Sequence, residues 1–433
     1  MLSSQLQQIT AHAEAGRPDA QYLLSQLKQQ DRDIDGMLFW LQKACESGHA
    51  DAIAAMGLCY EKGQGLESDM ARALLHYQRA VASGSKIAAF HQAQLLYKSQ
   101  LGAKRADEIK SLLVAAAEAG VVPALRTIGY LAMRQADCRE LAVNCLRRAA
   151  AAGDPVSSFN LGWSLLQEQH GEAGNNEAGY WLQLAANANY PLAVDFLASA
   201  VGNDAPSGMP TGAIDLDAPF ELYPPPTSVS KEVLRTDPPI EVYADVLDAA
   251  DRAYLMFLSR PHLQRAAVID PDGDSGGMVS KVRTNLSTYI PFELVDIISR
   301  YAELKIIGGI GEDLACSEPM SILCYAPGEY YRPHFDFFNP RLDVSRNFMK
   351  DGGQRTASAV TYLIAPTAGG GTSFPELELT VPAKTGGTLW FRNCFENGDV
   401  DKRSLHAGDT VEAGEKWVVT KWFREKPTKY LQL

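Results

Sequence analysis

The chain has 433 residues, of which 46% are hydrophobic and 21% charged, a balance typical of globular proteins and a length sufficient for two or three domains. Its formal net charge is −12, so no overall attraction favours a nucleic-acid backbone. No apolar run approaches the roughly 18 residues that a membrane helix requires. We therefore expect neither a nucleic-acid nor a membrane partner.

The first residues, MLSSQLQQITAHAEAG, lack the basic region and apolar stretch that mark a secretory signal. We therefore expect a cytoplasmic protein. The seven cysteines form no CxxC pair, which favours scattered reduced thiols over a disulfide framework or a zinc site.

A repeat of 32 to 36 residues runs through the N-terminal half and is marked by six anchors: Gly16, Gly48, Gly84, Gly120, Gly153 and Asn189. Ala stands four residues before each of the last five anchors, and a large side chain stands three residues before each of these alanines. Gly or Asn suits the left-handed cap that ends a helix, and Ala lets neighbouring helices approach closely. The pattern predicts helix pairs that stack into an α-solenoid over residues 1–200.

Units such as GHADAIAAMGLCYEKGQGLESDMARALLHYQRAVASG resemble the Sel-like repeat, a relative of the tetratricopeptide repeat. This resemblance implies a concave surface that binds a protein or peptide, while a purely architectural role stays open. Residues 201–237 are rich in Pro and Gly and read as a linker. Whether its FELYPPP stretch docks on a domain is left open.

Beyond residue 238 the pattern changes to short β-type runs separated by turn signals, preceded by one helix-like stretch at 248–260. The runs are SILCYAPG, SAVTYLIAP, GGTLWFRN and KWVVTKWF. Many short strands within fewer than 200 residues predict a sandwich or jelly roll with a few helices packed outside. The whole chain is thus expected to be a multidomain α + β protein.

The stretch YRPHFDFF at 331–338 places His334 and Asp336 on one face of a strand. Two such residues fill part of the two-His, one-carboxylate set that binds non-haem Fe(II). Beyond residue 230 the only other histidines are His262 and His406. We favour His406, which lies beside the predicted strands, and interpret His262 as a surface or core residue.

The same alternation turns Phe335 and Phe337 away from the metal and leaves Phe338 to line the pocket. In KWVVTKWF, it sets Lys416 and Trp422 on one face and Lys421 on the other. If the first face looks into the barrel, Lys416 is a buried ammonium that needs an anion. The alternative is a lysine at a strand end that reaches solvent.

Six stretches between about 238 and 426 together resemble the prolyl 4-hydroxylase branch of the Fe(II)- and 2-oxoglutarate-dependent dioxygenases. They are KVRTN, CYAPGEYYRPHFDFF, GGQRTASAVTYL, GGGTSFPEL, TGGTLWFRN and SLHAGDTVEAGEKWVVTKWF. The resemblance implies a double-stranded β-helix, or jelly roll with flanking helices, over residues 238–428. It implies that His334, Asp336 and His406 bind Fe(II), that Lys416 pairs the distal carboxylate of 2-oxoglutarate, and that O2 and ascorbate are cosubstrate and reductant.

Four further residues follow from the same resemblance. Tyr325 and Thr372 match positions that contact 2-oxoglutarate, and Arg355 and Trp422 match positions associated with the peptide substrate. For the last two, Arg355 pairing a nearby carboxylate and Trp422 filling the core stay open. The stretch FFNPRLDVSRNFMKDGG between Asp336 and Arg355 is somewhat long and basic in its middle, which leaves the substrate residue undetermined.

The sequence therefore predicts a hydroxylase of a protein or peptide side chain, with prolyl as the leading target and the helical repeats binding the substrate or a partner. One alternative is hydroxylation of another side chain or a free amino acid. The other is a non-catalytic scaffold whose oxygenase-like domain binds a partner without turnover.

Overall fold

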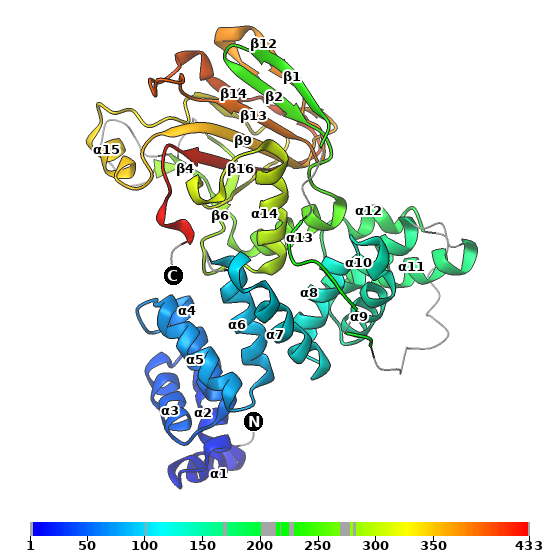
Figure 1. Ribbon diagram of the computed structural model, residues 1–433, viewed down its shortest axis with the longest axis vertical. Coiled ribbons are helices and arrows are strands. Elements are labelled where there is room, and N and C mark those ends of the chain that lie inside the picture. The colour runs from blue at the N-terminus through cyan, green and yellow to red at the C-terminus, as the bar shows by residue number, and fades with distance from the viewer. Residues whose placement is uncertain are drawn as a thin grey trace. The chain divides into compact units, whose positions relative to one another are not determined.

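The computed structural model describes residues 3–99, 102–167, 171–200, 214–216, 218–224, 229–268, 278–279 and 283–431. Contacts divide the chain into two compact units (Figure 1). The first contains the described residues up to 157 together with those from 214 to 222, and the second contains 158–200 with 223–431. Each unit is described by itself.

The first unit is built of consecutive helices that pack against one another. They are α1 (Ser3–Glu14), α2 (Pro18–Gln30), α3 (Ile34–Glu46), α4 (Ala50–Lys62), α5 (Met70–Ala82), α6 (Lys86–Lys98), α7 (Ala106–Glu118), α8 (Val122–Ala132) and α9 (Arg139–Ala151), with 3-10 turns η1 (Ala103–Arg105) and η2 (Ala136–Cys138). All six predicted anchors have left-handed backbone, with φ between 78° and 92° at the five glycines and 55° at Asn189. The predicted helix-pair repeat is confirmed.

Small residues allow the repeat helices to approach closely. The alanines four residues before the anchors are all fully buried. A Cβ added to Gly129 of α8 would come within 2.7 Å of the Leu146 side chain on α9, and one added to Gly57 of α4 within 2.8 Å of the Tyr77 ring on α5. Any larger residue at these glycines would push the paired helices apart.

The first three residues of the FELYPPP stretch, Phe220 to Leu222, pack within the first unit. Leu222 is 1% exposed, and its carbonyl accepts a hydrogen bond of 2.8 Å from the Tyr97 hydroxyl of α6. The backbone of Glu221 exchanges two hydrogen bonds with the Gln135 side chain, of 2.7 and 3.1 Å. Residues 201–213, 217 and 225–228 of the predicted linker lie outside the described residues, and 231–236 at its end form strand β1 rather than linker.

The second unit begins within α10 and combines helices with two main antiparallel sheets and two short strand pairs. Its helices are α10 (Pro155–Gln167), α11 (Gly171–Asn187), α12 (Ala193–Leu197), α13 (Ala249–Ser259), α14 (Ile297–Ile310) and α15 (Asp343–Met349), with 3-10 turns η3 (Arg260–His262), η4 (Leu314–Cys316), η5 (Pro375–Leu377), η6 (Lys402–Ser404) and η7 (Lys429–Leu431).

The larger sheet has eight strands in the order β1 (Lys231–Thr236), β2 (Pro239–Tyr243), β13 (Thr388–Arg392), β9 (Arg355–Ile364), β16 (Lys416–Arg424), β7 (Ser321–Tyr325), β6 (Leu286–Tyr289) and β3 (Gln264–Arg265). The smaller sheet has the order β12 (Leu379–Val381), β11 (Thr372–Phe374), β14 (His406–Gly408) and β8 (Tyr331–His334). Two short pairs complete the set: β10 (Ala368–Gly369) with β15 (Val411–Ala413), and β4 (Ala267–Val268) with β5 (Met278–Val279). The predicted jelly roll with flanking helices is confirmed.

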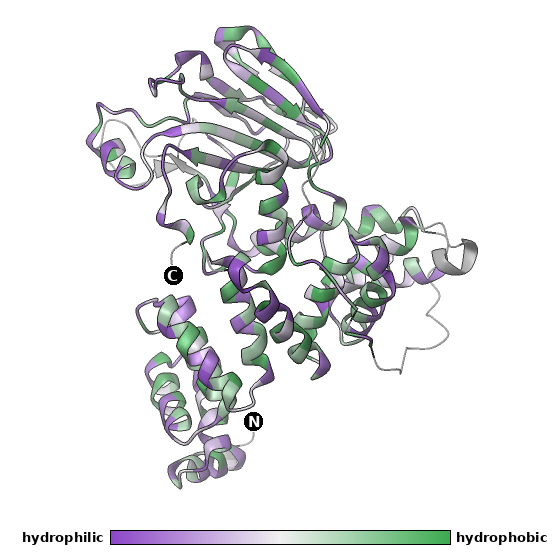
Figure 2. Cartoon of the chain, in the orientation of Figure 1, coloured by the Kyte–Doolittle hydropathy of each residue, from purple (hydrophilic) through white to green (hydrophobic). Residues whose placement is uncertain are grey.

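Helices α13 and α14 cover one face of the larger sheet and form the main core with it. The apolar residues of α14 pack there against Trp417, Val419 and Phe423 of β16. Helix α14 is mostly green, the colour of hydrophobic residues, in Figure 2. Lys421 lies on this same face, and its ammonium is buried in an ion pair with Glu303 of α14. The alternation predicted for KWVVTKWF is therefore confirmed on this side.

All seven cysteines are free thiols, and five of them are buried. Burial raises the pKa of Cys59 to about 11 and that of Cys324 to about 12, so these thiols stay protonated and weakly nucleophilic. Within the described residues, no helix is both long enough and apolar enough to span a membrane.

Candidate active site

Two imidazoles and one carboxylate converge at the inner end of the smaller sheet. His334 ends β8 and His406 begins β14, and the two stand directly opposite each other in the antiparallel pair. The Asp336 carboxylate lies 3.6 Å from Nε2 of each ring, and one ligand atom from each residue lies within 4.8 Å of the others. His262 is exposed in η3, outside this cluster.

Backbone carbonyls orient both imidazoles. Nδ1 of His334 lies 2.9 Å from the carbonyl of Arg332, and Nδ1 of His406 lies 3.0 Å from that of Ser404. Because a carbonyl only accepts, each Nδ1 carries the hydrogen and donates it, which leaves the Nε2 lone pair directed at the cluster. This is the arrangement that metal-ligating histidines adopt.

The charge states of the cluster also suit a metal ion. Burial opposes ionisation of Asp336, but the two imidazoles, the Arg355 guanidinium and a 2.6 Å hydrogen bond from Ser358 hold its pKa below its ordinary value. Burial and the neighbouring His406 lower the pKa of His334. A charged carboxylate and a neutral imidazole are the forms that bind metal. Two histidines and one carboxylate on one side of an ion fit Fe(II) with open positions for substrates.

The strand alternation predicted for YRPHFDFF stops at His334, where β8 ends. Phe335 is 39% exposed and stacks on Phe337 with ring centroids 4.6 Å apart. Both rings line the cavity described below, as does Phe338. The prediction that Phe335 and Phe337 turn away into packing is therefore wrong, because the backbone beyond His334 is no longer extended strand. The prediction for Phe338 is confirmed.

Lys416 is a buried ammonium without an ion pair among the described residues. It is 2% exposed, and it donates a hydrogen bond of 3.3 Å to the Gly371 carbonyl. Burial lowers its pKa to about 8, although Asp409 offsets part of that effect. Since an unpaired buried charge is costly, this end of the cavity is suited to receive an anion.

Tyr325 and Thr372 lie beside that ammonium. Tyr325 stands opposite Lys416 in the pairing of β7 with β16, and the ammonium lies 5.1 Å from the centre of its ring. Thr372 begins β11, and its hydroxyl shares a hydrogen bond of 2.9 Å with the hydroxyl of Tyr362. Both residues line the same cavity as Lys416, and their contact with a bound carboxylate stays a prediction.

Arg355 is paired with the carboxylate of Glu318, which no local sequence motif predicts. Its guanidinium donates two hydrogen bonds of 2.7 Å to Glu318, which also accepts one of 2.7 Å from Arg424. Of the two alternatives left open by the sequence, the structure shows the carboxylate pairing. Glu318 lies just before β7 and meets Arg355 only through the order of strands in the sheet, so spacing along the chain carries no signal for it.

Trp422 lines the cavity next to this ion pair. The Arg355 guanidinium lies 3.9 Å from the centre of its ring. The indole is 7% exposed, and its Nε1–H has no hydrogen-bond partner among the described residues. A buried donor without an acceptor is costly, so the Nε1–H is a polar group of the site whose hydrogen bond is not made within the described residues.

All eight residues predicted for the site line one cavity of about 750 Å³, a volume typical of small-molecule and substrate sites. The set is His334, Asp336, His406, Lys416, Tyr325, Thr372, Arg355 and Trp422. The cavity lies between the two sheets, with the metal-binding cluster on the smaller sheet and the ammonium on the larger. This arrangement can hold a divalent ion, an anion and an organic substrate together.

Comparison with known families matches residues 320–424 to the 2OG-Fe(II) oxygenase superfamily and residues 18–49, 50–85, 133–154 and 155–190 to the Sel1 repeat. The chain is similar to prolyl 4-hydroxylase 1 of Arabidopsis thaliana, with 31% identity over 215 residues that cover 46% of this chain and 74% of that protein. It is also similar to prolyl 4-hydroxylase subunit alpha-1 of Rattus norvegicus, with 31% identity over 195 residues, 45% of this chain but only 36% of that subunit.

Among solved structures, the chain is similar to the viral collagen prolyl hydroxylase of Paramecium bursaria Chlorella virus-1 in its 2-oxoglutarate complex. The sequence identity is 24%, the TM-score is 0.33, and the match covers 43% of this chain and 95% of the viral one.

Proposed function

The chain belongs to the prolyl 4-hydroxylase family of 2-oxoglutarate- and Fe(II)-dependent oxygenases, and on this basis we propose that it hydroxylates prolyl side chains in a protein or peptide. Its Sel1 repeats bind that substrate or a partner protein. Ascorbate as the reductant and the cytoplasm as the place of action are part of the same proposal.

The observation that carries the proposal is the position of an unpaired buried ammonium in the same cavity as the metal-binding cluster. His334, Asp336 and His406 hold Fe(II), which together with 2-oxoglutarate and O2 supplies the oxidising chemistry and leaves succinate and CO2. Lys416 neutralises the far carboxylate of 2-oxoglutarate. Once this carboxylate is bound, the ammonium is no longer an uncompensated charge.

On the substrate side of the cavity, the Trp422 indole and the Arg355 guanidinium lie beside the Glu318 carboxylate that Arg355 holds. The Nε1–H of Trp422 lacks an acceptor among the described residues, and the neighbouring Arg355 guanidinium also only donates. A backbone carbonyl of a bound peptide could accept a hydrogen bond from either donor. The choice of proline as the target rests on the similarity to prolyl 4-hydroxylases.

The test supplies the full-length chain with Fe(II), 2-oxoglutarate, ascorbate and a library of proline-containing peptides under isotopically labelled O2. We expect succinate to form together with peptides that carry one labelled oxygen on proline, and neither product with His334→Ala. Oxidation located on another residue by fragment spectra would replace the prolyl assignment. If neither succinate nor oxidised peptide forms, the enzymatic proposal is wrong. Omitting ascorbate tests its role as reductant.

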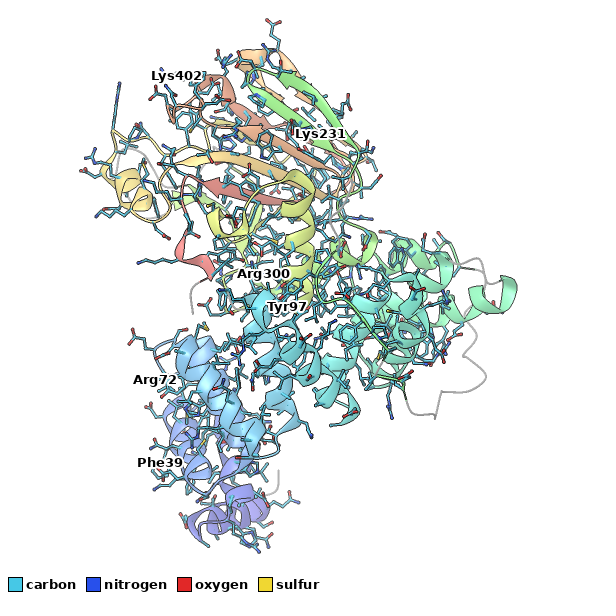
Figure 3. The ribbon with its side chains drawn as sticks, in the orientation of Figure 1. Phe39, Arg72, Tyr97, Lys231, Arg300 and Lys402 are labelled. Carbon is cyan, nitrogen blue, oxygen red and sulfur yellow. The ribbon has the colours of Figure 1, made fainter. Side chains whose placement is uncertain are left out.

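The role of the repeats has a separate test. Phe39 of α3 is 55% exposed and Leu75 of α5 is 54% exposed, and Figure 3 labels Phe39 together with Arg72 of α5. Replacing both apolar residues by Ser should raise KM for a whole protein substrate and leave kcat/KM for a short peptide unchanged. Equal kinetics for the whole protein substrate would contradict a role of these two residues in binding.

A further inference from the structure

Residues 337–353, here called the lip, form an ordered segment beside the cavity (α15 in Figure 1). Gln354 clamps the beginning of the lip, because it accepts a 2.7 Å hydrogen bond from the Phe338 backbone N–H and donates one of 2.9 Å to the Phe338 carbonyl. Arg424 of β16 holds its end, donating bonds of 2.8 and 2.6 Å to the carbonyls of Phe348 and Gly353. The lip is therefore fixed to the same strand that carries Lys416.

The lip presents apolar side chains that are exposed and line the cavity. Val344 and Phe348 are four residues apart on α15, so they share one face of the helix. They are 48% and 47% exposed, and both line the cavity that contains the metal-binding cluster. Phe348 stacks on Phe338 with ring centroids 5.7 Å apart. Of the thirteen large hydrophobic side chains exposed in the described residues, four line this one cavity, a concentration that marks a binding surface.

The charge of the lip is opposite to that of the chain as a whole. The lip carries Arg341, Arg346 and Lys350 against Asp343 and Asp351, whereas the chain has a net charge of −12. Arg346 is paired with Asp343, and the Asp351 carboxylate accepts a hydrogen bond from the backbone of residue 429. Within the described part of the chain, no ion pair involves Arg341 or Lys350, and both are exposed. The lip therefore presents two cations without an ion pair in the described part of the chain, which favours an acidic segment over a basic one at this place.

We infer that the lip selects the sequence around the hydroxylated residue. Val344 and Phe348 receive an apolar side chain next to the target, while Arg341 and Lys350 favour acidic residues further along the substrate. This inference rests on the proposed function and names its substrate class: a protein segment in which the target is flanked by an apolar residue and then by acidic ones. The lip acts on the residues that flank the target, whereas the metal-binding cluster and Lys416 act on the chemistry.

The test is a library of peptides with a central proline and randomised flanking residues, oxidised by the full-length holoenzyme and sequenced by mass spectrometry. We expect the wild type to enrich an aliphatic or aromatic neighbour of the oxidised proline. In Phe348→Ala that enrichment should fall about tenfold, because the variant loses the binding free energy of one partly buried aromatic ring. Phe395→Ala is the matched control, because Phe395 is 45% exposed and does not line the cavity.

The charge component is tested in the same library. Lys350→Glu should abolish the preference for acidic residues, and the wild-type preference should weaken as salt rises, since exposed charges are screened. Lys402→Glu, which changes an exposed lysine of η6 (Figure 3), should leave the preference intact. A 2-oxoglutarate affinity equal to that of the wild type shows that each variant keeps its fold and cosubstrate site.

Two results would overturn the inference alone: prolyl oxidation that ignores the flanking residues in the wild type, or selection that Phe348→Ala and Lys350→Glu leave unchanged. Oxidation of a residue other than proline, or no oxidation in any peptide, would instead overturn the proposed function and the inference with it. The site of the labelled oxygen separates these cases.

Discussion

Strand β16 carries two buried lysines on opposite faces, and replacing each by Met is expected to change stability in opposite directions. Burial lowers the pKa of both Lys416 and Lys421 to about 8, so the opposite outcomes come from the partner that each substitution leaves behind. Lys416→Met leaves no ion-paired carboxylate among the described residues, whereas Lys421→Met leaves the buried Glu303. Lys416 makes no ion pair within the described residues and faces the cavity. Lys421 is paired with Glu303 and also donates to the Glu318 carbonyl.

For Lys416, the pKa falls from 10.5 in the unfolded chain to about 8 in the fold, so burial of the charged form costs about 3 kcal/mol. Folding releases a proton between these two values, so wild-type stability rises with pH across that window. The cost is present in full below pH 8 and disappears as pH approaches 10.5. At pH 7 and without 2-oxoglutarate, Lys416→Met should therefore be more stable than the wild type by up to about 3 kcal/mol.

Cosubstrate binding should change in the other direction. Lys416→Met leaves a carboxylate of 2-oxoglutarate unpaired in a buried site, which costs about 3 kcal/mol or more and weakens affinity at least a hundredfold. Lys421→Met is the control: it removes one partner of the buried Glu303 and should destabilise the protein by about 3 kcal/mol. Glu303 keeps its hydrogen bonds from Arg300 and Tyr430, which limits that loss.

Calorimetric unfolding between pH 7 and 10, and titration of 2-oxoglutarate into the metal-loaded protein, measure both quantities. If Lys416→Met lost stability as Lys421→Met does, or bound 2-oxoglutarate like the wild type, then Lys416 would not be an uncompensated charge reserved for the cosubstrate. A stability difference that did not shrink above pH 8 would contradict the electrostatic origin of the effect.

Three more changes have defined outcomes. Ser358→Ala removes the hydrogen bond to Asp336 and should weaken metal affinity about 10- to 100-fold in titrations with Mn(II), with unchanged circular dichroism. Trp422→Phe should raise KM for an oxidised peptide about fivefold while KM for 2-oxoglutarate stays constant; a shift in both would contradict a substrate-side N–H. Gly129→Ala crowds a leucine of α9 and should lower the free energy of unfolding by about 1 to 3 kcal/mol. Gly308→Ala in α14 adds a Cβ that meets nothing within 4 Å, and it should raise the free energy of unfolding by about 1 kcal/mol.

The helical repeats could be predicted because the residues that determine each helix end lie within the repeat itself. A Gly that ends a helix needs a left-handed backbone wherever it occurs, and Gly16, Gly48 and the later anchors all have one. The docking of Glu221 and Leu222 could not be predicted, since it depends on Gln135 and Tyr97, more than 80 residues away in the chain. Nor does composition show that β1 joins a sheet through β2 and β13.

The site divides in the same way. His334, His406 and Lys416 were found because strand alternation and family spacing both act within short stretches, and the structure brings all three into one cavity. The sequence does not predict Glu318 as a site residue, because its ion pair with Arg355 forms only when β7, β16 and β9 lie side by side. Alternation predicts the wrong side for Phe335 because it holds only while the strand continues, and no local residue marks the end of β8 at His334.

The cross-strand pairing of His334 with His406 has a consequence for the resilience of the fold. The two rings come from positions about 70 residues apart, and β8 and β14 are themselves only four and three residues long. An ion bound by both rings must be released before these short strands can separate, so its binding free energy adds to the cost of that opening. We expect amide hydrogen exchange between residues 335 and 405 to accelerate when the metal is chelated. Iron supply would then govern how long this part of the chain resists proteolysis, independently of turnover.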